Sequence, residues 1–474
     1  MRTSGWYGQL FGLAAVLGCP WGLLGSVAAA QTAASTEILA EPTSYTDVLD
    51  AFEPADPFDI RISWGYEAST TRGTVQRELA TGAGDGRAGS RYVDIADSEY
   101  ATKRLTLDVE VGVFRDLMVF FQLPFVLEHD RSLHLPGEAA KDGSLQREQI
   151  DAALLEPLPT DGHPEIFRLR NGVASQPRDG IPSVSFGLAW SVFNQYRSRN
   201  VPTWTLRFAS EVGTGAIMLP CVLNDEPDPS EMELDSDDST CPRGVSQGTI
   251  RTEFGSRWSY RYRVVEPYLG VEYVHSFVGA AGDTFRPTGD LEGDVDSDPP
   301  SEMTFTSGVA VIPWENRSRF QRLSVDARFS ATYVSAGRDY SPLFDALGAS
   351  QNEYLTSLNR TQPGDQGEDV RFTGLTRVED HARIGARLTL LIQAARYVRF
   401  QLGTGIAYAA PHLLTGASPC NLDVEAAEGD PRRGTCLQGI SNPSYRAVID
   451  EPGKRFRLDG ALTLDISAAA SGQF

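Results

Sequence analysis

The sequence predicts an all-β fold, a transmembrane up-and-down antiparallel β-barrel of about 12 strands with short periplasmic turns and long extracellular loops. From Phe58 onward, large apolar side chains recur at every second position, which is the period of a strand with one apolar face. The connections between these stretches alternate between short and long. No run of about 18 apolar residues occurs beyond the N-terminal region, which excludes a helical membrane protein.

The composition agrees with this prediction once strand geometry is considered. The 474 residues are 41% hydrophobic, an ordinary value for a soluble protein. A strand that contacts lipid needs an apolar residue only at every second position, so a barrel keeps such an average. The 42 basic and 63 acidic residues give a net charge of −21, which argues against nucleic acid as a partner.

The first 30 residues have the pattern of a secretory signal peptide. Arg2 precedes an apolar stretch at residues 10–16, and Ala28-Ala29-Ala30 forms an A-x-A cleavage site. The alternatives are a short membrane anchor and a lipoprotein signal ending at Cys19. Cleavage after Ala30 removes Arg2, so the mature chain carries 41 − 63 = −22 charges. Residues 31–57 are expected to form a flexible periplasmic segment or a partial plug, and residues 58–474 the barrel.

Alternation of apolar and polar residues defines the strands in order. The twelve stretches are 58–66, 105–113, 117–127, 184–192, 204–208, 254–262, 269–273, 305–311, 323–333, 384–390, 398–408 and 458–466. Short links are expected near 115–116, 194–202, 263–266, 314–319 and 393–396, and long loops near 69–100, 129–180, 214–247, 279–300, 335–375 and 411–453. An even number of strands places both ends of the barrel chain on the short-turn, periplasmic side.

The aromatic residues and the C-terminus add to this prediction. Trp64, Trp190, Trp204 and Trp258 lie on the apolar parity near strand ends, as expected for membrane girdles, and Trp314 is expected in a turn. The chain ends in Phe474, and apolar residues recur at every second position before it. This resembles the C-terminal strand signal by which outer-membrane proteins are recognised by the barrel-assembly machinery.

The opposite parity of the strands carries the charges and is expected to line the lumen. The candidate lumen-lining residues are Arg251, Arg257, Arg261, Arg322, Arg328, Arg383, Arg387, Arg399, Arg455, Arg457, Asp108, Glu110, Glu253, Asp326 and Asp459. These residues form either a mutually paired ladder that fills the barrel or an arginine-lined path for anionic or amphipathic solutes. A barrel of about 12 strands lies between filled and open ones, so the sequence leaves both alternatives open.

Four cysteines remain after signal removal, in two local pairs within polar stretches. Their spacing favours the disulfides Cys221–Cys241 and Cys420–Cys436, and an oxidising compartment. Zinc is the alternative, but no Cys-x-x-Cys pair or histidine lies at ligand spacing. The excess acid lies in loops, notably residues 225–238 and 290–298. These loops could bridge divalent cations in lipopolysaccharide, although no EF-hand spacing is present.

Enzymatic function has little support. His275 precedes Ser276 on the outer rim, but the residues around the pair do not resemble a lipase nucleophile. Gly403-Thr404-Gly405 is a strand feature, because no helix follows to bind a phosphate. We therefore expect no catalytic residues, no cofactor and no metal site.

Part of the chain resembles a known family of outer-membrane barrels, the meta-pathway phenol-degradation and putative-transporter family. The resemblance covers about residues 105–215 and includes the strand–turn–strand Gly112–Leu117, the step Leu123–Val126, the strand start Gly180–Val184 and the strand end Glu211–Gly215. It implies an outer-membrane barrel for uptake of hydrophobic or aromatic solutes and supplies no catalytic residues.

The leading functional hypothesis is a passive outer-membrane channel for small, hydrophobic or anionic solutes in a Gram-negative bacterium. The alternative is a non-transporting structural or surface-interaction barrel that acts through its acidic loops. The expected partners are outer-membrane lipid, lipopolysaccharide, the barrel-assembly machinery and small solutes.

Overall fold

The fold is described from a computed structural model. It describes residues 45–53, 56–80, 90–134, 173–174, 178–220, 222–223, 239–240, 242–287, 292–348, 355, 372–395, 397–430, 433 and 436–473. All of these residues belong to one compact unit, residues 39–474.

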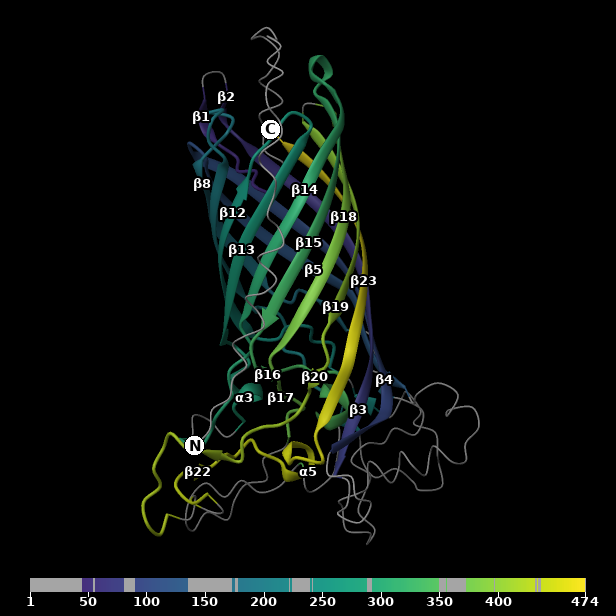
Figure 1. Ribbon diagram of the computed structural model, residues 1–474, viewed down its shortest axis with the longest axis vertical. Coiled ribbons are helices and arrows are strands. Elements are labelled where there is room, and N and C mark those ends of the chain that lie inside the picture. The colour runs from purple at the N-terminus through teal and green to yellow at the C-terminus, as the bar shows by residue number, and fades with distance from the viewer. Residues whose placement is uncertain are drawn as a thin grey trace, which may run out of the picture. The chain divides into compact units, whose positions relative to one another are not determined.

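Twelve long strands in this part of the chain close one antiparallel barrel (Figure 1). They are β3 (Ile60–Ala80), β4 (Ser90–Phe114), β5 (Leu117–His134), β8 (Val184–Phe193), β9 (Thr203–Val212), β12 (Thr249–Ser259), β13 (Val265–Val278), β14 (Glu302–Asn316), β15 (Gln321–Val334), β18 (His381–Ala395), β19 (Val398–Ala409) and β23 (Phe456–Gln473). Each pairs with the next, and β23 pairs with both β19 and β3, which closes the barrel. The predicted fold class and strand number are confirmed.

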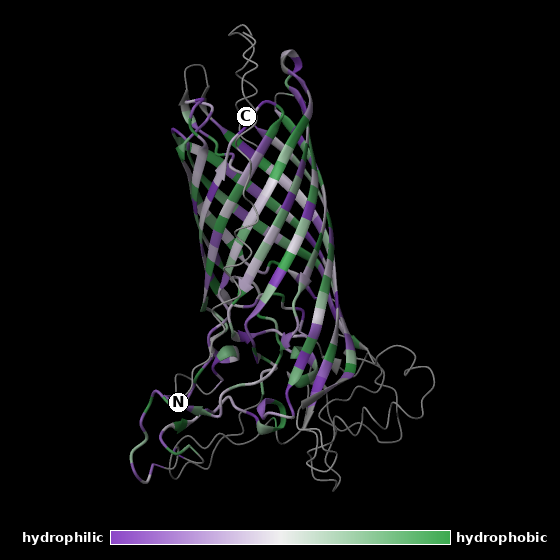
Figure 2. Cartoon of the chain, viewed as in Figure 1, coloured by the Kyte–Doolittle hydropathy of each residue, from purple (hydrophilic) through white to green (hydrophobic). Residues whose placement is uncertain are grey.

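The two faces of each strand differ as the alternation predicts. In β3, Ile62, Trp64 and Tyr66 are 40%, 47% and 38% exposed, whereas Arg61 and Glu67 face the lumen. Figure 2 shows the same alternation of hydrophobic and hydrophilic residues along the wall. An apolar outer surface around a polar lumen is the arrangement of a β-barrel in a bilayer. No helix of the described residues has the length and apolar character to cross a membrane.

The barrel has a short-turn end and a long-loop end. The short turns lie at residues 115–116, 194–202, 260–264 and 317–320, with a further short link between β18 and β19, and this end is uppermost in Figure 1. The hairpin β1 (Ala51–Glu53) and β2 (Asp56–Phe58) lies there too. The prediction that Trp314 lies in a turn is wrong. Trp314 belongs to β14 and is 50% exposed, because the strand continues through a bulge to Asn316.

The predicted loop at residues 69–100 is also wrong. Strands β3 and β4 continue to Ala80 and from Ser90, and they stay paired except at one bulge. Both strands are longer than the roughly 9–11 residues that a tilted strand needs to cross a bilayer. An exposed ion pair joins Arg72 of β3 to Glu99 of β4, and another joins Lys103 of β4 to Glu128 of β5. Both lie on the long-loop side of Tyr66, the last large outward apolar residue of β3. The apolar belt of the outer surface therefore ends near these pairs. Beyond it, the extensions of β3 and β4 are polar, so their sequence resembles that of a loop.

The long-loop end has small apolar cores of its own. The loops contribute the helices α3 (Gly282–Phe285), α4 (Phe344–Gly348) and α5 (Ala447–Asp450), and the short strands β6 (Val173–Ala174), β7 (Arg178–Gly180), β10 (Val222–Leu223), β11 (Ser239–Thr240), β16 (Gly337–Asp339), β17 (Thr376–Val378), β20 (His412–Leu413), β21 (Cys420–Asn421) and β22 (Ile440–Ser441). One buried cluster includes Val75, Ile95, Leu347 and Phe456, and a second contains Phe285 and Phe344. Each such side chain contributes about 1.5–3 kcal/mol on burial, so the described parts of these loops pack together, and we call them the loop cap.

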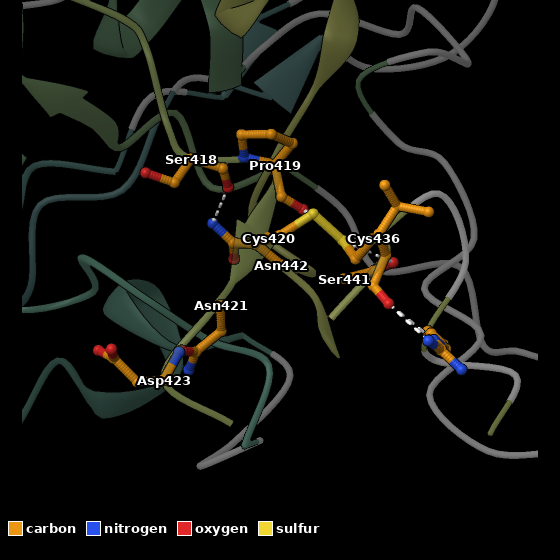
Figure 3. The surroundings of a disulfide bond; sticks show 10 residues. Ser418, Pro419, Cys420, Asn421, Asp423, Cys436, Ser441 and Asn442 are labelled. Atoms are coloured by element: carbon orange, nitrogen blue, oxygen red, sulfur yellow. Dashed lines mark hydrogen bonds between the residues drawn. A yellow bond between two sulfur atoms is a disulfide. The ribbon is translucent and has the colours of Figure 1, made fainter. Parts of the chain in front are cut away.

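A disulfide staples the last long loop. Cys420, in β21, is bonded to Cys436, and the amide of Asn442 donates to the carbonyl oxygen of Ser418 beside it at 2.7 Å (Figure 3). The predicted Cys420–Cys436 bond is confirmed. The predicted Cys221–Cys241 bond lies outside the described residues.

Candidate lumenal site

Part of the N-terminal segment lies inside the lumen at the short-turn end. The ring of Tyr45 stacks on Tyr268 with centroids 4.5 Å apart. The guanidinium groups of Arg257 and Arg328 lie 5.1 and 4.9 Å from the centroid of the Tyr45 ring. Each cation–π contact contributes about 0.5–2 kcal/mol. Tyr45 is therefore enclosed by an aromatic ring and two cations of the barrel wall.

The residues that follow are held by hydrogen bonds and by apolar packing. Thr46 is fully buried, with its Oγ1 2.7 Å from Oγ of Ser259, and its carbonyl oxygen accepts a hydrogen bond from Thr205. Leu49 is 3% exposed and packs in one cluster with Phe120 and its neighbours on the inner wall. Residues 45–50 thus have complementary polar and apolar partners along their length.

Two glycines of the wall make room for this segment. A Cβ at Gly112, in β4, would overlap the carbonyl group of Asp50, and a Cβ at Gly270, in β13, would overlap the hydroxyl of Tyr45. Both glycines lie on the inward parity of their strands, where the sequence otherwise places polar side chains. These inward glycines are the sequence signal that could have located the segment.

The carboxylate of Asp47 joins two strands of the wall. It lies 2.6 Å from Arg61 of β3 and 3.2 Å from Arg399 of β19. Arg61 also pairs with Glu110 of β4 at 2.9 Å. The side chains of Asp47, Arg61 and Arg399 are only 12–27% exposed, so their charge-assisted bonds are shielded from water. Neither Asp47 nor Tyr45 was among the predicted site residues.

A polar cavity of about 380 Å³ lies beside this carboxylate. Its basic lining residues are Arg61, Arg104, Arg322, Arg387 and Arg399, and its acidic ones are Glu67, Asp108 and Glu110. Six uncharged residues, in register on neighbouring strands, also face the cavity and form what we call the uncharged band. They are Gly65, Thr106, Ser324, Leu391, Gln401 and Ala469. A second, polar cavity adjoins Tyr45, Glu272 and Gln401.

Most predicted lumen residues take part in ion pairs across the wall. Pairs join Arg251 to Glu302 (3.2 Å) and Glu211 (3.7 Å), Arg257 to Glu272 (3.0 Å) and Glu253 (3.8 Å), Arg383 to Glu302 (2.7 Å), Arg387 to Asp465 (3.0 Å), and Arg328 to Asp326 (3.2 Å). Arg322 and Asp108 line the cavity without an ion pair among the described residues.

Four predicted residues lie away from this site. Arg261 lies beyond the end of β12 in a short turn, where it pairs with Glu315 at 3.3 Å. Arg455 precedes β23 at the long-loop end and binds Glu78 at 2.7 and 3.0 Å. Arg457 and Asp459 form a 3.8 Å pair at the same end. They belong to the turns and the loop cap instead of the cavity.

The Gly403-Thr404-Gly405 stretch has a packing role in the wall. A Cβ at Gly405 would overlap the carboxylate of Asp465, and one at Gly403 would press on Ser467. The absence of both side chains lets Arg387 reach across β19 to Asp465 at 3.0 Å and to Ser467 at 2.6 Å. These two glycines therefore support one rung of the charge ladder.

The outer surface carries the predicted aromatic residues. Trp64 and Trp190 are 47% and 46% exposed, and Trp204 stacks on Trp258 with ring centroids 6.4 Å apart. His275 is exposed and lies 2.8 Å from Oγ of Ser301, while Ser276 is buried on the opposite face of β13. Phe474 lies outside the described residues. No group of three metal-ligating side chains occurs among the residues that the structure covers.

Comparisons with known proteins give structural similarity only. No family model and no curated protein matches, so membership of the meta-pathway family is not confirmed. An outer membrane channel from Pseudomonas putida F1 is 10% identical, with a TM-score of 0.35 over 90% of this chain and 98% of that one. A FadL homologue from Pseudomonas aeruginosa is 8% identical, with a TM-score of 0.33 over 88% and 90%. The outer membrane protease OmpT from Escherichia coli is 8% identical, with a TM-score of 0.26 over 90% and 100%.

Similarity at this level does not extend to ligand or activity. The strand pairing itself, with the outward apolar and inward charged residues, makes the chain a transmembrane β-barrel of twelve strands.

Proposed function

We propose that this protein is an outer-membrane channel for small solutes, and that its own N-terminal segment closes the lumen at rest. The observation that carries the proposal is the position of residues 45–50 beside a polar cavity of about 380 Å³ within the barrel. A lumen filled with apolar side chains would exclude water, whereas this one retains polar space between charged walls.

The proposed orientation follows from the two ends of the barrel. Short turns face the periplasm in barrels of this kind, and long loops face outward. The N-terminal segment then enters from the periplasmic side, after export directed by the signal peptide predicted at residues 1–30. In this arrangement, lipid contacts the apolar belt, and lipopolysaccharide contacts the level of the Arg72–Glu99 and Lys103–Glu128 pairs.

The closure is noncovalent and therefore reversible. Among its described contacts are the Tyr45–Tyr268 stack, the Asp47 ion pairs and the buried Thr46–Ser259 contact. An exposed ion pair contributes little, but shielded charge-assisted bonds contribute about 1.5–3 kcal/mol each. Because so few contacts hold residues 45–50, one substitution can substantially reduce the free energy of binding of this segment. The pairing of the barrel strands is left unchanged.

Conductance of the refolded full chain in a planar lipid bilayer tests the proposal. We expect a low conductance for the wild type and a larger one for the double variant Tyr45→Ala/Asp47→Ala. Tyr262→Ala is the matched control, because Tyr262 is 63% exposed at the same end of the barrel. Failure of every variant to conduct, with correct folding, would overturn the proposal.

A second candidate function is a non-transporting surface barrel. The apolar clusters under the long loops favour it, because they form an ordered cap over the other end. This candidate predicts no conductance in the double variant. It also predicts that shortening the acidic stretch at residues 225–238 removes a surface phenotype without changing permeability.

A further inference from the structure

We propose that the cavity beside Asp47 binds a small organic carboxylate, and that Asp47 is a built-in competitor for the arginines that hold it. This inference deepens the proposed function, because it names the class of solute and a link between solute and closure. It rests on that function for the link only, since a binding site in the lumen can be measured without transport.

The first support is that this part of the lumen already holds a carboxylate. Asp47 lies 2.6 Å from Arg61 and 3.2 Å from Arg399, on β3 and β19. These two strands flank β23, so the two arginines face the same space from either side of it. Arginine presents N–H donors in a planar fork that matches a carboxylate. A solute carboxylate would satisfy the same donors once Asp47 has left.

The second support is an arginine in the same cavity that lacks a partner. Nη1 of Arg322 is shielded from solvent and has no hydrogen-bond acceptor among the described residues. Its cross-strand neighbour Glu315 pairs with Arg261 through Oε2 at 3.3 Å, and Oε1 of Glu315 does not bond to Arg322. A shielded donor without an acceptor costs about 1–3 kcal/mol, more when charged. A ligand oxygen at this position would remove that cost.

The third support is the charge around the cavity. Its five arginines face three lining carboxylates and two further ones, Asp465 and Asp47, that pair with Arg387 and with Arg61 and Arg399. The count is 5 − 5 = 0 with the N-terminal segment in place, and 5 − 4 = +1 once Asp47 has left. One monovalent anion restores neutrality. The site therefore favours a ligand with one carboxylate over a neutral or cationic one.

The uncharged band describes the rest of the ligand. Leu391 and Ala469 face the cavity one level away from the Arg322 and Arg399 side chains, together with small or neutral neighbours. The cavity volume of about 380 Å³ lies at the lower end of the range for small-molecule sites, which span roughly 300–1,000 Å³. A compact, uncharged body carrying one carboxylate fits this arrangement.

Calorimetric titration of the refolded full chain with benzoate tests the site, with benzamide as the neutral comparison. We expect benzoate to bind at least about tenfold more tightly than benzamide. Arg322→Gln should weaken benzoate binding by about tenfold, and Asp47→Asn should strengthen it by a similar factor. Arg251→Gln is the matched control, because Arg251 has two acidic partners and lies outside the cavity lining, so its binding should match the wild type.

Arg322→Lys protects the test against a folding defect, since it keeps the charge but loses the fork and should bind benzoate with intermediate affinity. Equal affinities for benzoate and benzamide, or unchanged binding in Arg322→Gln, would overturn the site. Unchanged binding in Asp47→Asn would overturn the competition. Chloride currents in the double variant of Tyr45 and Asp47, without any benzoate binding, would leave the channel proposal standing and remove only this inference.

Discussion

The ring of Tyr45 stacks on the ring of Tyr268 with 4.5 Å between centroids, although the two residues lie more than 200 positions apart in the chain. Tyr268 in turn donates a hydrogen bond to Asp326 at 2.5 Å and accepts one from Arg328 at 3.1 Å. Tyr268 thus connects the N-terminal segment to Asp326 and Arg328 of β15. A substitution in one of these groups is therefore expected to alter the contacts of the other.

Gly112→Ala is expected to displace the N-terminal segment. The new Cβ overlaps the backbone carbonyl of Asp50, which cannot move aside as a flexible side chain would. Overpacking of this kind costs about 1–3 kcal/mol. Limited proteolysis should therefore cleave the segment faster in this variant. Gly65→Ala is the matched control on the neighbouring strand, because its Cβ would meet only Ala469, at 3.9 Å. Equal cleavage rates in the two variants would contradict the proposed fit.

Asp345→Ala is expected to loosen the loop cap and leave the barrel intact. Asp345 lies 2.6 Å from Arg178 and 3.3 Å from Arg131, and all three side chains are at most 7% exposed. Its removal leaves two buried guanidinium groups without this partner, at a cost of about 3–5 kcal/mol. Hydrogen exchange should accelerate in α4 and β7 but not in β12. Asp298→Ala removes an exposed pair with Arg286 and should change exchange little. Similar effects of the two substitutions would count against an ordered cap.

The loop cap should lose stability in mild acid through His412. Burial lowers the pKa of His412, which lies in β20 of the cap, to about 4 from an ordinary 6.5. The folded state disfavours the protonated ring. The stability that neutral His412 contributes to the cap is therefore complete above pH 6.5 and is lost as the pH falls towards 4. His412→Phe can keep the stacking on His381 and removes the titration. Hydrogen exchange in β20 should rise across this pH range in the wild type more than in the variant. A parallel rise in both would show that another group titrates.

Removal of the Cys420–Cys436 bond should affect one loop only. The bond closes a 16-residue separation, and such a closure contributes about 3 kcal/mol by restricting the unfolded loop. In Cys420→Ser/Cys436→Ser, exchange in β21 and β22 should increase. Exchange in β19 should stay unchanged, because its pairing with β23 does not depend on the loop. Loss of protection throughout the barrel would contradict this separation.

Sequence reasoning predicted the barrel well, because its signal is local and repeated. Apolar residues at alternate positions, such as Leu464 and Ile466, identify the lipid-facing side of a strand from a few positions. These two side chains are 54% and 61% exposed. The extensions of β3 and β4 were missed because Ser69, Thr70, Thr71 and Arg72 follow one another in β3 and are all polar, so the alternation of hydrophobicity fades while the pairing with β4 continues.

The site was predicted only in part for a different reason. The lumen parity identifies Arg322 and Arg251 equally, but only the arrangement of the strands shows that Arg251 has acidic partners and Arg322 has none among the described residues. Asp47 and Tyr45 lie outside every alternating stretch, and the partners Arg399 and Tyr268 are distant in sequence. Their role depends on tertiary contacts that no periodic pattern records.

A reversible lock on the N-terminal segment tests the central claim most directly. Oγ1 of Thr46 and Oγ of Ser259 lie 2.7 Å apart, so Thr46→Cys/Ser259→Cys places two thiols within reach of a disulfide. This pair is introduced into Tyr45→Ala/Asp47→Ala, and bilayer current is recorded before and after reduction. The same background without the new cysteines controls for reduction of native disulfides. We predict a low current in the oxidised state, a larger one after reduction, and no change in the control. The same current in both states of the locked protein would contradict closure by this segment.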